Sequence, residues 1–142
     1  IKQDFSDELF SLQFMGTSTA PVFGLVAQSP YKYDLITASK KLTLREWHHV
    51  VATWDVASKS MKIYIDGENK GSVTMKNIKA TSTFATDAPV VIGSQFYDAT
   101  KVLSGYYGFD GKINGVLIDD RVWSASEISA FYDNNKAKTA SW

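Results

Sequence analysis

The chain has 142 residues, 44% of them hydrophobic and 13% aromatic, which is enough apolar material for one domain of ordinary size with one core. Its fifteen basic residues balance fifteen acidic ones and are scattered, which argues against nucleic acid as a partner because no excess positive charge exists to neutralise phosphates. No apolar run approaches the roughly 20 residues that a membrane span requires, and the absence of cysteine excludes disulfides and thiolate metal sites.

Short runs rich in β-branched and aromatic residues, separated by turn residues, predict a succession of strands. In chain order these runs cover residues 9–14, 22–27, 31–38, 41–44, 47–54, 61–66, 71–75, 90–93 and 109–123. Asp66 and Gly67 tolerate left-handed backbone and predict a tight hairpin after the sixth run. The spacing predicts an all-β fold, a two-sheet antiparallel jelly-roll sandwich over residues 1–135, followed by a tail at 136–142.

The third predicted strand alternates two kinds of side chain. Tyr31, Tyr33 and Leu35 share one face, and we interpret them as half-buried packing rather than as a platform for a sugar. Lys32 and Asp34 point the other way, and we expect them to be solvated.

One short helix is predicted near the C-terminus. Ser124 is a suitable N-cap, and Glu127 three residues later completes a capping box. Trp123 and Ile128 are spaced for a hydrophobic staple at the same helix start.

Residues 45–55 read REWHHVVATWD and contain both histidines of the chain. In an extended strand, successive side chains point to opposite faces, so His48 and His49 are not expected to reach the same metal ion. We interpret the segment as structural, with Trp47 or Trp54 strongly buried. A role for one imidazole as a general base stays open at this point.

The motifs WHHVVATWD, MKIYIDG, VVIG and FDGKINGVLIDDRVWSASEI occur in this order. Together they resemble the laminin-G-like and pentraxin-like branch of the concanavalin A-like lectin and glucanase jelly rolls, over about residues 42–132. The resemblance implies a β-sandwich and favours an extracellular or cell-surface location. It leaves the activity open, because this superfold carries lectins, adhesion modules, accessory domains and hydrolases.

The chain departs from the family pattern in two places. The family's Gly-Lys-Ile-Asp-Glu-Val appears here as GKINGV, residues 111–116, so the acids that could hold calcium in relatives are missing. The additional Trp-containing strand with which relatives usually open is not found. A sheet edge is then expected to be covered by residues 1–8, by the C-terminal tail or by a second copy in a homodimer.

Catalysis on this superfold needs converging acids, and retaining glycosidases resemble Glu-x-Asp-x-x-Glu on one strand. No such string occurs, and Asp119 and Asp120 are adjacent, so they would point to opposite faces of a strand. The chain's glutamates fall at predicted strand ends, in a turn and in the helix cap: Glu8, Glu46, Glu68 and Glu127. We therefore expect a protein that is not an enzyme, with no catalytic residues.

The longest predicted loop, residues 94–110, interleaves aromatic, amide and acidic side chains. Sugar recognition uses this mixture, because pyranose faces stack on rings while hydroxyls need polar partners. The candidate ligand-binding residues are Gln95, Phe96, Tyr97, Asp98, Tyr106, Tyr107 and Asp110. Calcium is an open alternative as a cofactor, with Asp98 or Asp110 as a ligand in this loop.

The predicted function is that of a non-catalytic carbohydrate-binding or adhesion module. Such a module is compatible with a place in a larger extracellular protein. Two alternatives stay open: a protein-interaction or structural β-sandwich domain, and, less favoured, a glycoside hydrolase or polysaccharide lyase. The partners expected are a carbohydrate (glycan) or a protein ligand, and neither nucleic acid nor a membrane span.

Overall fold

The structure is a computed structural model and describes residues 9–28, 31–84, 90–94, 96–98, 101–102 and 108–136. Eight strands and one helix lie in these residues. They are β1 (Phe10–Phe14), β2 (Pro21–Gln28), β3 (Tyr31–Thr37), β4 (Val50–Asp55), β5 (Ser60–Ile65), β6 (Glu68–Thr74), β7 (Phe96–Asp98), β8 (Lys101–Val102) and α1 (Ala125–Asn135).

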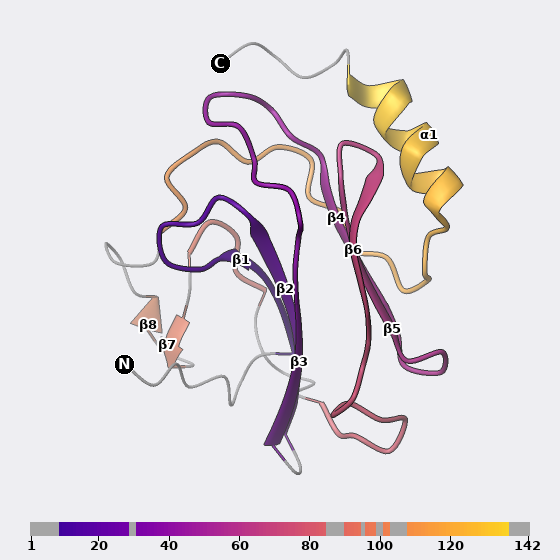
Figure 1. Cartoon of the computed structure of the whole chain (residues 1–142). Coiled ribbons are helices and arrows are strands. Elements are labelled where there is room, and N and C mark those ends of the chain that lie inside the picture. The colour runs from indigo at the N-terminus through magenta and orange to yellow at the C-terminus, as the bar shows by residue number, and fades with distance from the viewer. Residues whose placement is uncertain are drawn as a thin grey trace.

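The strands form two three-stranded antiparallel sheets and one small pair. The first sheet has the order β1-β2-β3 and the second the order β4-β5-β6, while β7 pairs with β8. In Figure 1 the second sheet lies between the first sheet and helix α1. This arrangement confirms the predicted antiparallel β-sandwich with one C-terminal helix.

The core lies between the facing sides of the two sheets. Met61, Ile63 and Ile65 are fully buried and alternate along β5 with residues of its other face. They pack against Phe23 and Leu25 of β2 in one contiguous cluster. Burial of this apolar surface is the main force that holds the sheets together.

Trp54 occupies the join between the sheets. Its ring lies 5.5 Å from the ring of Phe10 and 5.7 Å from that of Phe23, measured between centroids, and both partners belong to the first sheet. Trp54 and Trp47 are each only partly buried. The prediction that one of them is strongly buried is therefore wrong, because Trp54 spans the rim of the core rather than its centre.

Asp34 on β3 corrects a second expectation. It is buried, with 8% of its surface exposed, and its carboxylate accepts hydrogen bonds from the backbone N–H groups of Lys76, Asn77 and Ile78 at 3.1, 3.0 and 2.8 Å. A buried carboxylate that accepts several N–H bonds is compensated for its lost hydration. Asp34 thus joins β3 to the segment after β6, while on the opposite face of the strand Tyr33 is 49% and Leu35 39% exposed.

Two short predicted strands are not formed. Residues 41–44 lead into a turn in which Arg45 adopts a φ of 64°, and this left-handed residue ends any extended run. Residues 90–93 also lie outside any strand, and Gly93 adopts a φ of 80°. The small β7–β8 pair falls instead inside the segment that the sequence predicts as a long loop.

The predicted last strand, residues 109–123, is likewise an irregular segment. Within the part of the chain that the structure describes, it pairs with no sheet, and Gly115 interrupts it with a φ of 66°. Its large apolar side chains are exposed, Leu117 at 63%: Phe109, Ile113, Val116, Leu117, Ile118 and Val122. The residue pattern is suited to a strand, but a strand also needs a neighbouring edge to bond to.

We expect Trp54→Ala to lower the free energy of unfolding by about 3 kcal/mol, because it removes the ring that joins Phe10 to Phe23 and leaves a cavity at the rim of the core. Chemical denaturation at equilibrium measures this loss. Leu44→Ala is the matched control, since Leu44 is exposed and should change stability by less than about 0.5 kcal/mol. A loss below about 1 kcal/mol for the Trp54 variant would contradict its role at the join.

Candidate functional site

The turn between β5 and β6 has a left-handed backbone at two successive residues. Asp66 has a φ of 54° and Gly67 a φ of 81°, which confirms the left-handed hairpin predicted from this pair. Asp is one of the few residues other than glycine that adopt this backbone at low cost. Gly67 is required for a second reason, because a Cβ there would lie 3.1 Å from the ring of Tyr132 on α1.

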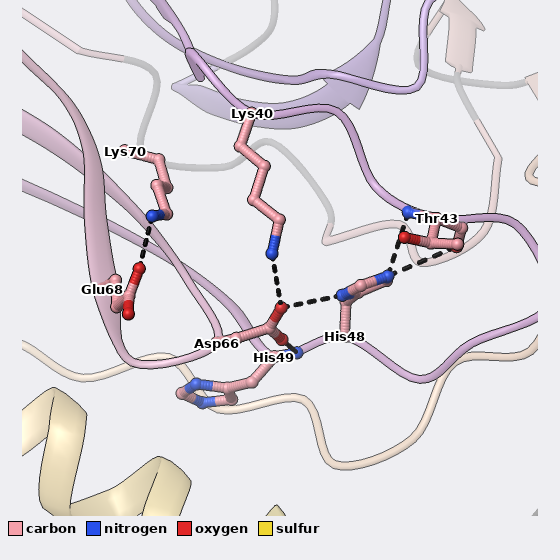
Figure 2. A network of polar contacts seen from close by, with 7 residues as sticks. All are labelled: Lys40, Thr43, His48, His49, Asp66, Glu68 and Lys70. Atoms are coloured by element: carbon pink, nitrogen blue, oxygen red, sulfur yellow. Dashed lines mark hydrogen bonds and ion pairs between the residues drawn. The ribbon is translucent and has the colours of Figure 1, made fainter.

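The carboxylate of Asp66 is the centre of a polar network (Figure 2). One oxygen accepts hydrogen bonds from His48 Nδ1 at 2.9 Å and from Lys40 Nζ at 3.3 Å. The other accepts the backbone N–H of His49 at 3.1 Å, and the N–H of Asp66 donates to the carbonyl of His49 at 2.8 Å. The network therefore fixes the start of β4 against the β5–β6 turn.

His48 serves this network as a structural group. Its Nε2 lies 3.1 Å from the backbone N–H of Thr43 and accepts from it, which leaves Nδ1 to carry the proton donated to Asp66. The side chain of His48 is only 8% exposed, and that of Asp66 19%. Burial favours the neutral acid at Asp66, but hydrogen bonds from His48 and from the N–H of His49 outweigh it and lower the pKa of Asp66 below its ordinary value.

His49 points the opposite way, toward helix α1 (Figure 2). Its ring stacks on Phe131 and Tyr132, with centroids 5.5 and 6.1 Å apart. Burial lowers the pKa of His49, and the nearby charge of Asp66 offsets this only in part. The two imidazoles thus face different partners, as the sequence predicts, and no group of three His, Asp or Glu side chains suited to a metal ion occurs among the described residues.

Helix α1 begins with the predicted capping box. The Ser124 side chain accepts the N–H of Glu127, and the Glu127 carboxylate accepts the N–H of Ser124 at 2.7 Å. Hydrogen bonds from the Ser124 backbone, from Arg121 and from the Ser124 hydroxyl lower the pKa of Glu127 to about 2. The start of the helix is therefore fixed, and with it the segment that precedes it.

Trp123, just before the helix, is held by three contacts. Its ring lies edge-on against Phe131, with the centroids 5.4 Å apart, and its indole N–H donates to Asp119. The guanidinium of Arg121 lies 5.2 Å from the ring centre and is paired with Glu127. These contacts set the position of an indole that remains partly exposed.

A groove of about 190 Å³ lies between this segment and the face of β4 and β5 that points away from the core. Its residues come from alternate positions on the two strands, from the turn between them and from residues 122–125: Thr53, Asp55, Ser58, Ser60, Lys62, Tyr64, Val122, Trp123, Ser124 and Ala125. The β4–β5 register sets Thr53 opposite Lys62 and Asp55 opposite Ser60. The volume is below the roughly 300–1,000 Å³ of pockets for drug-sized ligands, which suits a single ring of a larger ligand.

The groove combines two rings with hydroxyl and charged groups. Trp123 supplies the partly exposed aromatic surface, whereas the Tyr64 ring that also lines the groove is only 2% exposed. Thr53 and Ser60 supply hydroxyls from the two strands. The carboxylate of Asp55 is already engaged in its own turn, where it accepts the Ala57 N–H at 2.9 Å and the Ser58 hydroxyl at 2.6 Å. These hydrogen bonds, that of Ser58 first, lower the pKa of Asp55, so it stays ionised.

Most of the ligand-binding residues predicted from the sequence lie outside the residues whose side chains the structure describes. Gln95, Tyr106 and Tyr107 lie outside the described residues, and only the backbone is described for Phe96–Asp98, which forms β7. Asp110 is exposed. That ligand-binding set stays a prediction, as does calcium at Asp98 or Asp110.

The groove is a site that the sequence analysis missed. The alternation of Ser60, Lys62 and Tyr64 is readable from the sequence, and so is the helix cap. Nothing in the sequence places Trp123 over these residues, because that contact depends on how α1 packs beside the β5–β6 turn.

A scan against family models matches residues 2–129 to the concanavalin A-like lectin/glucanases superfamily. The chain belongs to this superfamily. The match covers most of the chain and both sheets, and it agrees with the resemblance seen in the strand motifs. No curated protein matches the chain.

A solved structure with a similar fold is that of an S-layer domain-containing protein from Clostridium thermocellum, residues 221–444. The TM-score is 0.52 and the sequence identity 20% over 93% of this chain. The match covers 66% of that protein's chain, just under two thirds of it. At this identity the likeness shows the fold alone, and proteins that share a fold can differ in function. In the described part of the chain, no helix has the length and hydropathy needed to cross a membrane.

We expect Asp66→Asn to lower the free energy of unfolding by about 1–2 kcal/mol at neutral pH, since Asn keeps the left-handed turn but loses the charged partner of His48. Because the folded-state pKa of Asp66 lies below 3.8, its carboxylate adds stability that is complete above that pH and is lost as the pH falls through the lower folded value. The variant should therefore lose less stability than the wild type on acidification. Urea denaturation from pH 7 to pH 2 measures both effects.

Lys40→Gln is the control, because Lys40 is well exposed and its pair with Asp66 should contribute little. Parallel stability curves for the wild type and the Asp66 variant down to the lowest pH would contradict the role given to this carboxylate.

Proposed function

We propose that the chain is a non-catalytic carbohydrate-binding or adhesion module and that its ligand occupies the groove over β4 and β5. The single observation that supports this is the groove itself, in which a positioned indole flanks a row of hydroxyl side chains. The superfamily, which includes lectins, makes carbohydrate the ligand class of first choice.

The physical basis is the match between such a groove and a sugar ring. Pyranose rings present apolar C–H faces that pack on aromatic side chains, and their hydroxyls need polar partners at the edges. Thr53 and Ser60 line the groove beside Trp123, whereas the hydroxyl of Ser124 is engaged by the helix cap. The shallow site, which lies open on the face of a sheet, is suited to a sugar at the surface of a larger glycan.

The proposal that the module is not an enzyme is supported by the positions of its acids. Glu127 is occupied by the helix cap, and Glu68 is paired with Lys70 in an exposed turn. Asp55 is engaged by its own turn, and it is the acid that lines the groove. A glycosidase needs two carboxyl groups on either side of the scissile bond.

An extracellular or cell-surface location is part of the same proposal. The similar fold of an S-layer domain-containing protein supports it, because that protein is named for a layer at the cell surface. Binding of glycans at a surface would also fit a module that forms part of a larger protein.

Trp123→Ala should reduce glycan affinity about tenfold or more, because it removes the aromatic side of the groove. Glycan-array screening of the wild type, with and without calcium, identifies a ligand, and titration calorimetry then measures the variant. Ser60→Tyr provides an independent test, since a ring at this position fills the groove without changing Trp123.

Tyr33→Ala is the matched control, because Tyr33 is an exposed aromatic residue of the other sheet. The folded state of each variant is checked by its melting curve. An array with no binding by the wild type in either condition, or full affinity in both groove variants, would exclude this function for the groove.

A second candidate function, association with another copy of the chain, is favoured by the exposed apolar segment of residues 109–123. Exposed apolar residues in a continuous row are typical of surfaces that are covered in an assembly. Two such segments aligned antiparallel about Val116 would set Lys112 of one copy opposite Asp120 of the other. The net charge of zero does not oppose pairing.

On this second candidate we expect a dimer in solution and a monomer for the double variant Leu117→Ser with Ile118→Ser, measured by sedimentation equilibrium. Both residues are exposed, so the changes should leave the fold intact. Leu44→Ser, at an exposed position outside the segment, is the control. A monomeric wild type over the accessible concentration range would refute this candidate.

A further inference from the structure

We propose that the ligand of the β4–β5 groove is an acidic saccharide and that Lys62 is the residue that selects it. This inference rests on the proposed carbohydrate-binding function and adds the chemical class of the sugar. It is based on where Lys62 lies, on which residues surround it, and on the absence of an acid paired with its ammonium group in the described part of the chain.

Lys62 lies at the middle of β5, the central strand of its sheet. The register sets it between Thr53 of β4 and Ser72 of β6, and its neighbours two residues away on the same face are Ser60 and Tyr64. These four neighbours are all neutral hydroxyl residues, and the acid nearest on the same face is Asp55, diagonally across on β4. The hydroxyls of these four neighbours can donate or accept hydrogen bonds but cannot neutralise the charge of the Lys62 ammonium group.

Three of the lysines in the described part of the chain are paired with an acid. Lys40 pairs with Asp66, Lys70 with Glu68 and Lys136 with Asp133. Lys62 forms no ion pair with any carboxylate in the described part of the chain, although it lines a groove and is partly buried. A partly desolvated cation gains most from a charged partner supplied by a ligand.

Asp55 is the other charged residue of the groove, and it forms no ion pair with Lys62. Its carboxylate accepts hydrogen bonds from Ala57 and Ser58 within the β4–β5 turn, so its lone pairs are partly used by the protein. It lies opposite Ser60, one cross-strand pair away from Lys62 on the same face. The groove thus offers a ligand one unpaired positive group, next to hydroxyls and an indole, which fits a sugar ring that carries a carboxylate or sulfate.

The test compares matched sugars on one array: uronic acid oligosaccharides, the same oligosaccharides with methyl-esterified carboxyls, sulfated oligosaccharides, and neutral ones. Wild type is compared with Lys62→Gln, Lys62→Arg and Lys41→Gln. Lys41 is an exposed lysine outside the groove, so its variant controls for the loss of one positive charge. The uronic and sulfated arms distinguish the two sources of negative charge.

We expect acidic sugars to bind and their methyl esters to bind at least about tenfold more weakly, since a charge-assisted hydrogen bond is lost. Lys62→Gln should lose about the same factor for the acidic sugar only, Lys62→Arg should restore most of it, and Lys41→Gln should change it less than about twofold. The affinity for acidic sugars should also fall with added salt in the wild type.

Binding of neutral sugars or esters as tight as that of the acids, or an unchanged affinity in Lys62→Gln, would overturn the role of Lys62 and leave the proposed carbohydrate function standing. If no sugar of any class binds the wild type, the proposed function itself fails, and the inference fails with it. Melting curves of all variants confirm that each is folded.

Discussion

The arrangement of the second half of the molecule depends on one carboxylate, that of Asp66. It sits in a left-handed turn and accepts hydrogen bonds from His48, from the backbone of His49 and from Lys40. These contacts fix the entry of β4 beside the β5–β6 turn. Because the backbone of His49 is held on one side, its ring is presented on the other, where it stacks on α1. A single polar group thus couples a hairpin, the first residues of a strand and a helix.

The position of the groove depends on the same contacts between the β5–β6 turn and helix α1. Helix α1 packs beside the turn, where Gly67 leaves room for Tyr132, and its capping box sets the residues just before it. Trp123 is then held by Arg121, Asp119 and Phe131 over the outer face of β4 and β5. The core side of these strands is closed by Met61, Ile63 and Ile65, so the outer face is free to carry polar residues. Stability and the proposed binding therefore use opposite faces of one strand.

The helix cap and the hairpin were predictable because each depends on residues a few positions apart in the chain. The capping box needs only Ser124 and Glu127 at the right spacing, and the hairpin needs only residues that accept positive φ. Alternation predicted β5 because one face is buried. The strand predicted for residues 109–123 does not form, since side chains that favour strands make no strand without a neighbouring edge to pair with. The expectation that Asp34 is solvated is also wrong, because three backbone N–H groups from a distant segment decide its burial.

The sequence by itself determined the antiparallel β-sandwich, the hairpin at Asp66 and the capped C-terminal helix, and its motifs determined the superfamily. These depend on residue periodicity and on contacts within a few positions along the chain. Only the tertiary structure decided which groups His48 and His49 contact, and that Lys62 lies between Thr53 and Ser72 in one groove with Trp123. The reason is that such contacts join residues distant in sequence. Their geometry is set by strand register and helix packing, which depend on the whole core being formed.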